Sequence, residues 1–354
     1  MINISDRRNL LIKVYVIGYP NRGESICILF LDAGYDNKVL YSIVIDSFKY
    51  KGLNETVEIL NQWGIDKDKL NMLVWSHPDY DHTYGINEII NKFCNENTMV
   101  ILPYDLNGEV WNKVKYNRED KNIVQNILKL TRRKYKSHET ACVPEKMFVP
   151  FKNLVFNDLI GDLSTTIQAV SPHGSRINYL LESYSEIHKN DLSLCLQIDI
   201  GNDYKYSLVF LSDIENDGIE MLYPRCYELP VFIKIPHHAS STSNKFCNMI
   251  SSLEEKLYIA CTTIYKSQKL PEKELLSEYR KNVRQVDCTG FSRSGKQNYG
   301  LIEYTFDFYN DFKITVQHEG HASIVDDTFL EKITYKGAGG ILRGLSPAPL
   351  TKYL

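Results

Sequence analysis

The stretch MLVWSHPDYDHTYGI, residues 72–86, places four side chains able to bind a metal ion within six positions. They are His77, Asp79, Asp81 and His82, and they follow a short apolar run. Imidazole nitrogens and carboxylate oxygens are ligands that divalent ions take from proteins. Because residues two apart point the same way in an extended turn, His77 and Asp79 can grip one ion, while Asp81 and His82 can face a second.

Two later apolar runs end in residues of the same kinds. The run YSLVFLS is followed by Asp213, and the run VFIKI leads, after one proline, to His237 and His238. Because the ends of strands share one edge in a layered α/β protein, we expect the three loops to meet around one pocket. Asp213 has two carboxylate oxygens and can bridge two ions roughly 3.5–4 Å apart, and His237 can complete the second site.

The elements that must position these loops follow from the hydrophobic pattern. Strands are predicted at residues 11–17, 25–31, 41–47, 70–76, 99–103, 165–170, 192–200, 206–212, 231–235 and 256–264. Helical spacing predicts helices at 53–63, 84–94, 243–254 and 271–283, and residues 299–318 have the pattern of a strand pair that closes a sheet.

The composition is that of an ordinary globular protein. The chain has 354 residues, is 43% hydrophobic and carries a net charge of −3, so the whole molecule has no strong bias toward nucleic acid. Eight cysteines without a CxxC pair indicate buried free thiols in a reducing cytosol. The sequence shows no signal peptide and no apolar run of 18 residues, so we expect a cytoplasmic protein without a membrane span.

Residues 105–150 depart from the strand-and-helix pattern and are polar, basic and predicted to be mostly helical. Between Asn112 and Lys136 there are nine lysines and arginines against two acids. This stretch is either a solvated helix face or an inserted cap that attracts a polyanion. From about Lys336 the chain is rich in glycine and proline, which is typical of a flexible tail or a docking peptide.

The motif HPDYDH, followed by TYG, resembles the HxHxDH signature of the metallo-β-lactamase superfamily. The aspartate at the second histidine position resembles the soluble hydrolase domain of the competence protein ComEC and its free-standing relatives. The segments GESICILF, YSIVIDS, AVSP, NDLSLCLQI, LVFLSDIE and IKIPHHASSTS follow in the family's order, over roughly residues 11–310. Ser212 and Ala239 stand where the family often has glycine, and Phe48 replaces another glycine.

The resemblance implies a four-layer αββα sandwich, in which two mixed sheets face each other, helices lie outside and metals bind at one edge. The hydrolase domain would cover residues 1–335, with the basic insert at about 105–150 and a tail at 336–354. Carried over by position, the ligands are His77 and Asp79 for the first metal, Asp81 and His82 for the second, Asp213 as the bridge and His237 as the last ligand. Asp46 would support the loop by hydrogen bonding.

A third protein ligand for the first metal is left open between His173, His138 and a water or substrate atom, since a catalytic site needs an open position. The cofactors would be two divalent ions, Zn²⁺ or Mn²⁺, because Asp79 in place of an imidazole makes the site harder. Asp81 can orient the attacking water and accept its proton.

Several polar residues are candidates for contact with a substrate. His238, Ser240 and Ser241 either contact a substrate phosphate or hold His237 through hydrogen bonds inside the loop. Arg293 and Lys296, in the segment GFSRSGKQNYG, can contribute to a phosphate cradle. The sequence places Lys234, His188, His318 and His321 at the surface or in turns.

The leading hypothesis is a two-metal hydrolase that acts as a nuclease or phosphodiesterase on nucleic acid, with Asp81 and His238 as its catalytic residues. One alternative is hydrolysis of a small molecule such as a lactone, a thioester or a cyclic nucleotide. A further alternative is an effector subunit of a defence or toxin system whose site is gated by a protein partner, docked on the 105–150 insert or the tail.

Overall fold

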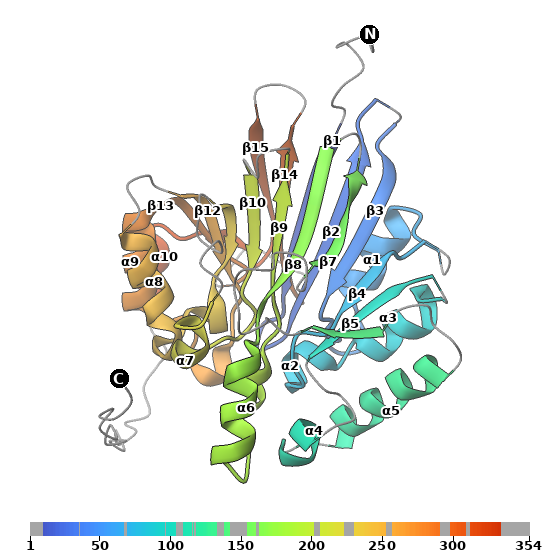
Figure 1. Cartoon of the computed structure of the whole chain (residues 1–354). Coiled ribbons are helices and arrows are strands. Elements are labelled where there is room, and N and C mark those ends of the chain that lie inside the picture. The colour runs from blue at the N-terminus through green and yellow to red at the C-terminus, as the bar shows by residue number, and fades with distance from the viewer. Residues whose placement is uncertain are drawn as a thin grey trace.

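Two β-sheets pack face to face, with helices on both outer sides (Figure 1). This arrangement confirms the predicted αββα sandwich. The computed structural model describes residues 10–34, 36–66, 69–95, 97–103, 109–114, 116, 118–132, 138–141, 154–160, 163–201, 206–222, 230–252, 257–290, 298–308 and 312–333.

The first sheet has eight strands in the order β15-β14-β1-β2-β3-β4-β5-β6. Its strands are β1 (Leu10–Gly18), β2 (Glu24–Asp32), β3 (Lys38–Ile45), β4 (Met72–Val74), β5 (Met99–Pro103), β6 (His138–Ala141), β14 (Gly300–Asp307) and β15 (Lys313–Gly320). The pairs from β15 to β3 are antiparallel, whereas β3 to β6 are parallel. The sheet is therefore mixed, and β3 is the strand at which the direction of pairing changes.

The second sheet also has eight strands, in the order β16-β13-β12-β11-β10-β9-β8-β7. They are β7 (Leu154–Ile160), β8 (Leu163–Ser171), β9 (Cys195–Ile200), β10 (Tyr206–Phe210), β11 (Pro230–Lys234), β12 (Leu257–Thr262), β13 (Val283–Cys288) and β16 (Ser323–Ile324). Strands β10 to β13 are parallel, and the pairs at both ends are antiparallel. Here the direction of pairing changes at β10.

The helices form the two outer layers and the lower edge of the sandwich in Figure 1. They are α1 (Glu55–Gln62), α2 (Tyr80–Thr83), α3 (Ile86–Phe93), α4 (Glu109–Lys113), α5 (Arg118–Arg132), α6 (Gly174–Ser183), α7 (Asn216–Ile219), α8 (Asn244–Ser251), α9 (Lys273–Asn282) and α10 (Asp327–Lys332). Helices α1 and α3 cover the first sheet, and α8, α9 and α10 cover the second. Among the described residues, no helix combines the length and the apolar character needed to cross a membrane.

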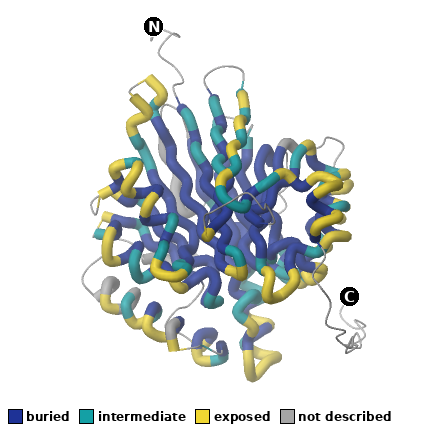
Figure 2. The backbone as a smooth tube through the Cα atoms, turned by 180° about the vertical axis from the view of Figure 1, so that it is seen from behind, coloured by how far each residue is buried: buried dark blue, intermediate teal, exposed yellow. Residues whose placement is uncertain are grey.

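Side-chain alternation along the strands builds the apolar layers of this sandwich. In β1, Val14 and Val16 point into the core between the sheets, while Tyr15 and Ile17 point into the core under the helices of the first sheet. A third core lies between the second sheet and its helices. Figure 2 shows the result, with the strands dark blue in the interior and the exposed residues concentrated on helices and loop tips. Because both faces of the central strands are covered, their sequences are almost continuously apolar.

Most predicted strands are present, and several elements were not predicted. Strands β7, β13 and β16 and helices α2, α6, α7 and α10 lie in segments that the sequence pattern did not assign. The predicted helix at 271–283 is helix α9, and β13 begins directly after it. Within the 105–150 insert, α4 and α5 are helical as expected, and β6 extends the first sheet. The tail at 336–354 lies outside the described residues.

Candidate metal centre

The candidate residues lie just beyond the carboxyl ends of strands from both sheets. Asp46 follows β3 and His77 follows β4 in the first sheet, whereas Asp213 follows β10 and His238 follows β11 in the second. Both pairs of strands are parallel, so each pair delivers its two loops to the same edge. Open α/β sheets bind ligands at such carboxyl ends, where the direction of strand pairing changes.

The backbone of these loops is left-handed at several non-glycine residues. The φ angle is +57° at Asp46, +43° at Ser212, +50° at His238 and +58° at Ala239. Ser212 and Ala239 are two of the positions where the resembled family often has glycine, which takes this conformation without steric cost. Each such residue costs on the order of 1–3 kcal/mol, so the surrounding packing must hold the loops in shape.

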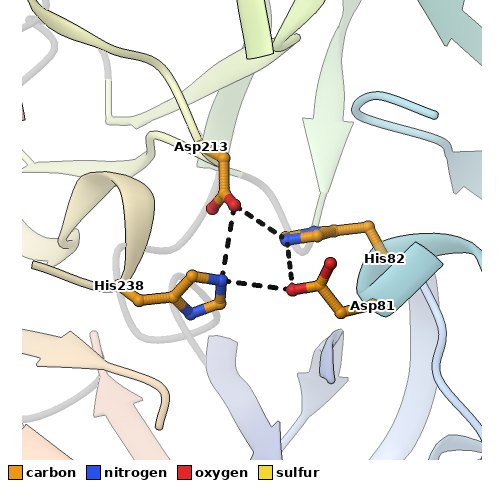
Figure 3. A group of neighbouring side chains, drawn as sticks. All are labelled: Asp81, His82, Asp213 and His238. Atoms are coloured by element: carbon orange, nitrogen blue, oxygen red, sulfur yellow. Dashed lines mark ion pairs between the residues drawn. The ribbon is translucent and has the colours of Figure 1, made fainter. Parts of the chain in front are cut away.

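Four side chains converge on one point, as Figure 3 shows: Asp81, His82, Asp213 and His238. Asp213 Oδ2 lies 3.3 Å from His82 Nε2 and 3.3 Å from His238 Nε2. Asp81 Oδ2 lies 3.3 Å from His238 Nε2 and 3.6 Å from His82 Nε2. In a tetrahedral site with bonds of about 2.0–2.2 Å, ligand atoms lie about 3.3–3.6 Å apart. The spacing therefore fits one divalent ion at the centre.

Unpartnered buried atoms support the same conclusion. All four residues are buried, yet His82 Nε2, His238 Nε2, both carboxylate oxygens of Asp81 and Asp213 Oδ1 have no hydrogen-bond partner. Buried polar atoms are nearly always hydrogen-bonded, because leaving one unpaired costs free energy. A cation among these nitrogens and oxygens would satisfy them together, so the residues present fit a metal ion.

The other ring nitrogens of the two histidines are held by neighbouring side chains. His82 Nδ1 lies 2.8 Å from Asp46 Oδ2, and His238 Nδ1 lies 2.7 Å from Thr263 Oγ1. Asp46 also accepts hydrogen bonds from the backbone and the hydroxyl of Ser76, at 2.7 and 2.5 Å. Contacts of this kind fix the ring orientation and leave Nε2 facing the metal. Asp46 thus makes the supporting hydrogen bonds that the sequence predicted.

His77 lies beside the four-residue cluster. Its Nδ1 is 3.0 Å from Ser76 Oγ and 3.2 Å from Ser212 Oγ, and its buried Nε2 is 3.9 Å from Asp213 Oδ2. The rings of His77 and His82 are 4.3 Å apart between centroids. His77 and His82 also lie within reach of Asp46, whose carboxylate is already engaged by Ser76 and His82.

The electrostatics of the cluster favour the ionised form of Asp213. Burial alone would raise the pKa of Asp213, but His238 and His82 hold this pKa well below its usual range. Burial and the neighbouring His82 lower the pKa of His77. Burial opposes the charged form of His238, yet Asp213 raises its pKa to about 9. Asp213 therefore presents negatively charged oxygens to any cation that enters the site.

A buried ion pair lies behind His238. Lys234 Nζ is 2.8 Å from Glu24 Oε2, and both side chains are almost completely buried. Glu24 also accepts a hydrogen bond from Thr263, the partner of His238. The interpretation of Lys234 as a surface residue is wrong. It shares the face of β11 with Phe232, which points into the core between the sheets, so its side chain meets β2 of the opposite sheet.

The structure exchanges the two adjacent histidines relative to the prediction. His238, predicted to contact substrate, belongs to the cluster, and His237, predicted as the last ligand, does not. His237 Nδ1 instead lies 2.8 Å from Thr242 Oγ1 and 3.1 Å from Glu215 Oε1. Both histidines have left-handed backbone angles, so the usual alternation of side chains does not apply across this turn.

Two further predicted ligands also lie away from the cluster. Asp79 caps the N-terminus of α2 by accepting a hydrogen bond from the Tyr80 amide at 2.7 Å, and it belongs to neither group of converging donors. His173 caps α6, with its Nδ1 2.7 Å from Ser175 Oγ. The backbone of His138 begins β6, and its side chain is outside the described residues.

The residues predicted to contact substrate have a different arrangement. Ser240 Oγ accepts a hydrogen bond from the Thr242 amide at 3.3 Å, and Ser241 bonds to Glu272 at 2.8 Å through both its amide and its hydroxyl. These hydroxyls stabilise the loop itself. Arg293 and Lys296 lie outside the described residues.

The remaining histidines differ in their surroundings. His318 Nε2 lies 2.8 Å from the carboxylate of Asp287, which is completely buried, so His318 is part of a buried polar contact. His188 lines a cleft of about 300 Å³ together with Asp79, Glu186, Ile187, Lys189, Asn190 and Glu215. His321 lines a second cavity, of about 210 Å³, between the turn after β1 and the end of β13.

Comparisons with known proteins give limited resemblances. A scan of protein-family models and a search of curated protein sequences found no match. Among solved structures, the Rm3 metallo-β-lactamase is 12% identical with a TM-score of 0.31, over 68% of this chain and 76% of that one. The metallo-β-lactamase SMB-1 is 11% identical with a TM-score of 0.32, and the match covers 79% of this chain and 95% of that one. GOB-18 from Elizabethkingia meningoseptica is 12% identical with a TM-score of 0.30, over 79% and 87%. Sequence identities and TM-scores this low do not identify the family of the chain.

Proposed function

We propose that this chain is a metal-dependent hydrolase whose divalent ion binds Asp81, His82, Asp213 and His238. The observation that carries the proposal is the convergence of these buried, unpartnered donor atoms, with neighbouring contacts of 3.3–3.6 Å. Two carboxylates and two imidazoles suit Zn²⁺ or Mn²⁺. The motif resemblance to ComEC-like hydrolases is consistent with this function, and so is the place of the four donors at the strand ends of an αββα sandwich.

The chemistry divides between the ion and the chain. A bound divalent ion supplies Lewis acidity and makes water available as a nucleophile near neutral pH. Asp81 is the best-placed general base, because both of its oxygens are buried at the centre without hydrogen-bond partners. Asp46 and Thr263 hold the rings of His82 and His238 in orientation, and the packed loops exclude water from their inner side. In this assignment His238 acts as a ligand, whereas the sequence suggested a catalytic contact with substrate.

We favour a nucleic-acid phosphodiester as the substrate. Helix α5 of the basic insert packs against α2, the helix that contains Asp81 and His82. Arg118, Lys121 and Lys129 are exposed on α5, so they are available to phosphate groups. Exposed cations near a catalytic centre attract a polyanion independently of its sequence. The insert therefore supports a nuclease or phosphodiesterase.

One observation favours the small-molecule alternative. The cleft of about 300 Å³ that reaches Asp79 is of a size that holds a small ligand. Hydrolysis of a lactone, a thioester or a cyclic nucleotide would need no extended binding surface. Gating by a protein partner, and the cytoplasmic location, remain predictions from the sequence.

A cleavage assay after metal removal tests the proposed function. We expect protein stripped with EDTA to be inactive, and added Mn²⁺ or Zn²⁺ to restore cleavage of single-stranded DNA, plasmid DNA or RNA. Asp213→Ala should abolish the activity, while Asp66→Ala, an exposed acid far along the chain from the cluster, should leave it unchanged. Metal-independent cleavage, or an active Asp213→Ala enzyme, would contradict the proposal. Activity confined to model lactones or thioesters would favour the small-molecule alternative.

A further inference from the structure

A lysine contacts Asp79, which the sequence assigned, together with His77, to the ion outside the four-residue cluster. Lys189 begins a 3₁₀ segment, Lys189–Leu192, that precedes β9. Its Nζ is 3.4 Å from Asp79 Oδ1 and 3.2 Å from Asp120 Oδ2. The Asp120 side chain is completely buried, and that of Lys189 is 22% exposed. The ammonium group is therefore held between two carboxylates, one from the HPDYDH loop and one from the basic insert.

Among the described residues, Asp46, His77 and His82 form a second group of close donors, but His82 also belongs to the first group and the Asp46 carboxylate is engaged by Ser76 and His82. His77 Nε2 faces the bridging carboxylate of Asp213. Asp79, the predicted partner of His77, is engaged by the Tyr80 amide and by Lys189. His173, the candidate third ligand, caps α6. The Tyr80 amide and Lys189 both contact Asp79 Oδ1, so an ion bound by His77 and Asp79 would either displace the Lys189 ammonium or lie on the same carboxylate beside it.

Charge reinforces this competition. An ammonium and a divalent cation repel each other strongly at short range, particularly where burial weakens solvent screening. Conversely, a carboxylate already paired with Lys189 attracts a second cation less. Asp120 makes the arrangement durable, because a buried carboxylate that loses its cationic partner is strongly destabilising.

We infer that the centre holds one divalent ion, on Asp81, His82, Asp213 and His238, and that the Lys189 ammonium, held by Asp79 and Asp120, takes the place of a second. The inference rests on the proposed metal-dependent function and replaces the two-ion centre implied by the motif. Lys189 also lines the cleft beside Asp79, so its positive charge is available to an anionic oxygen of a substrate bound there. Lys189 would then stabilise negative charge that a second ion neutralises in two-metal sites.

Metal stoichiometry tests the inference without measuring activity. Metal-free protein is titrated with Mn²⁺, and bound ion is measured by equilibrium dialysis and by electron paramagnetic resonance, in which two neighbouring ions give a coupled signal. We expect one tightly bound Mn²⁺ in the wild type. Lys189→Met should bind a second ion at least tenfold more tightly than the wild type does, with a coupled signal, while Lys189→Arg should keep one ion because it keeps the charge.

A second variant guards against a folding defect. Lys189→Met removes a cation that contacts the buried Asp120 carboxylate, so Lys189→Met combined with Asp120→Asn removes both charges and should also gain the second ion. Two ions of similar affinity in the wild type, or an unchanged stoichiometry in both lysine-to-methionine variants, would overturn the inference while leaving the proposed hydrolase intact. A wild type that binds no Mn²⁺ and no Zn²⁺ would overturn both.

Discussion

His82 Nδ1 lies 2.8 Å from Asp46 Oδ2, and this contact connects the end of β3 to the helix that follows β4. With Nδ1 held at this carboxylate, Nε2 of the same ring faces Asp213 and Asp81. Asp46 is itself held by two hydrogen bonds from Ser76. The orientation of a candidate ligand is therefore set by a residue that does not face the ion.

Replacement of Asp46 should weaken metal binding without removing a ligand. Changes to groups that orient metal-binding histidines typically cost 10- to 100-fold in affinity, and we expect Asp46→Asn to fall in this range. Competition against a chromogenic chelator measures the affinity. Asp66→Asn, at an exposed aspartate, serves as the matched control and should keep wild-type affinity. An Asp46→Asn protein with unaltered affinity would show that His82 needs no such support.

The two adjacent histidines should differ sharply when each is replaced. His238→Ala removes one of four donors and should reduce metal content to well below one ion per chain, whereas His237→Ala should retain the ion because His237 contacts Glu215 and Thr242 instead. Metal analysis after dialysis of the two variants separates the possibilities. The reverse result would restore His237 as the ligand that the sequence predicted.

Metal affinity should rise with pH. The pKa of His238, about 9, lies above the ordinary value of 6.5, so an entering ion must displace a proton below pH 9. If one proton is displaced, the apparent affinity for the metal ion should fall about tenfold for each pH unit below the pKa of His238. The stability of the metal-free protein should instead decrease as the pH rises. The raised pKa of His238 contributes folding stability that is fully present below pH 6.5 and is lost as the pH rises through 9.

Two sets of measurements check these opposite dependences of metal affinity and of stability on pH. Calorimetric binding curves between pH 6.5 and 9 should show affinity increasing with pH, and urea unfolding of the metal-free protein should show stability decreasing over the same interval. A metal affinity independent of pH would mean that His238 is already neutral in the metal-free protein.

The buried pair between Glu24 and Lys234 should be sensitive to loss of one partner. Burial alone would raise the pKa of Glu24 and lower that of Lys234, but their mutual attraction moves both pKa values in the other direction. Lys234→Met leaves the buried Glu24 carboxylate without its lysine, and we expect it to lower the free energy of unfolding by about 3–5 kcal/mol. Adding Glu24→Gln should recover part of the loss. Urea denaturation measures the free energy of unfolding of both variants. If the losses caused by the two single substitutions simply added in the double mutant, the two groups would not interact.

Much of the site location was predictable, because each candidate loop follows a recognisable apolar run. Asp81, His82 and Asp213 were named from the sequence, and the structure brings them together. The choice between His237 and His238 was not predictable, because consecutive left-handed residues abolish the alternation on which such assignments depend.

The other differences also arise from contacts distant in the chain. The part played by Lys234 depends on Glu24, which lies in the opposite sheet, and no local pattern reveals that pairing. Lys189 carries no motif signal, and its importance is apparent only from Asp79 and Asp120. Strand β13 begins directly after α9, so the change from helical to alternating periodicity had no turn residue to mark it.

The four donors come in equal numbers from the two sheets, since Asp81 and His82 follow β4, while Asp213 and His238 follow β10 and β11. An ion held by all four would join the halves of the sandwich across their seam, much as a disulfide joins two segments of chain. Because such a cross-link exists only in the folded protein, its binding energy adds to the folding energy, and chelation would loosen the seam before the sheets themselves separate.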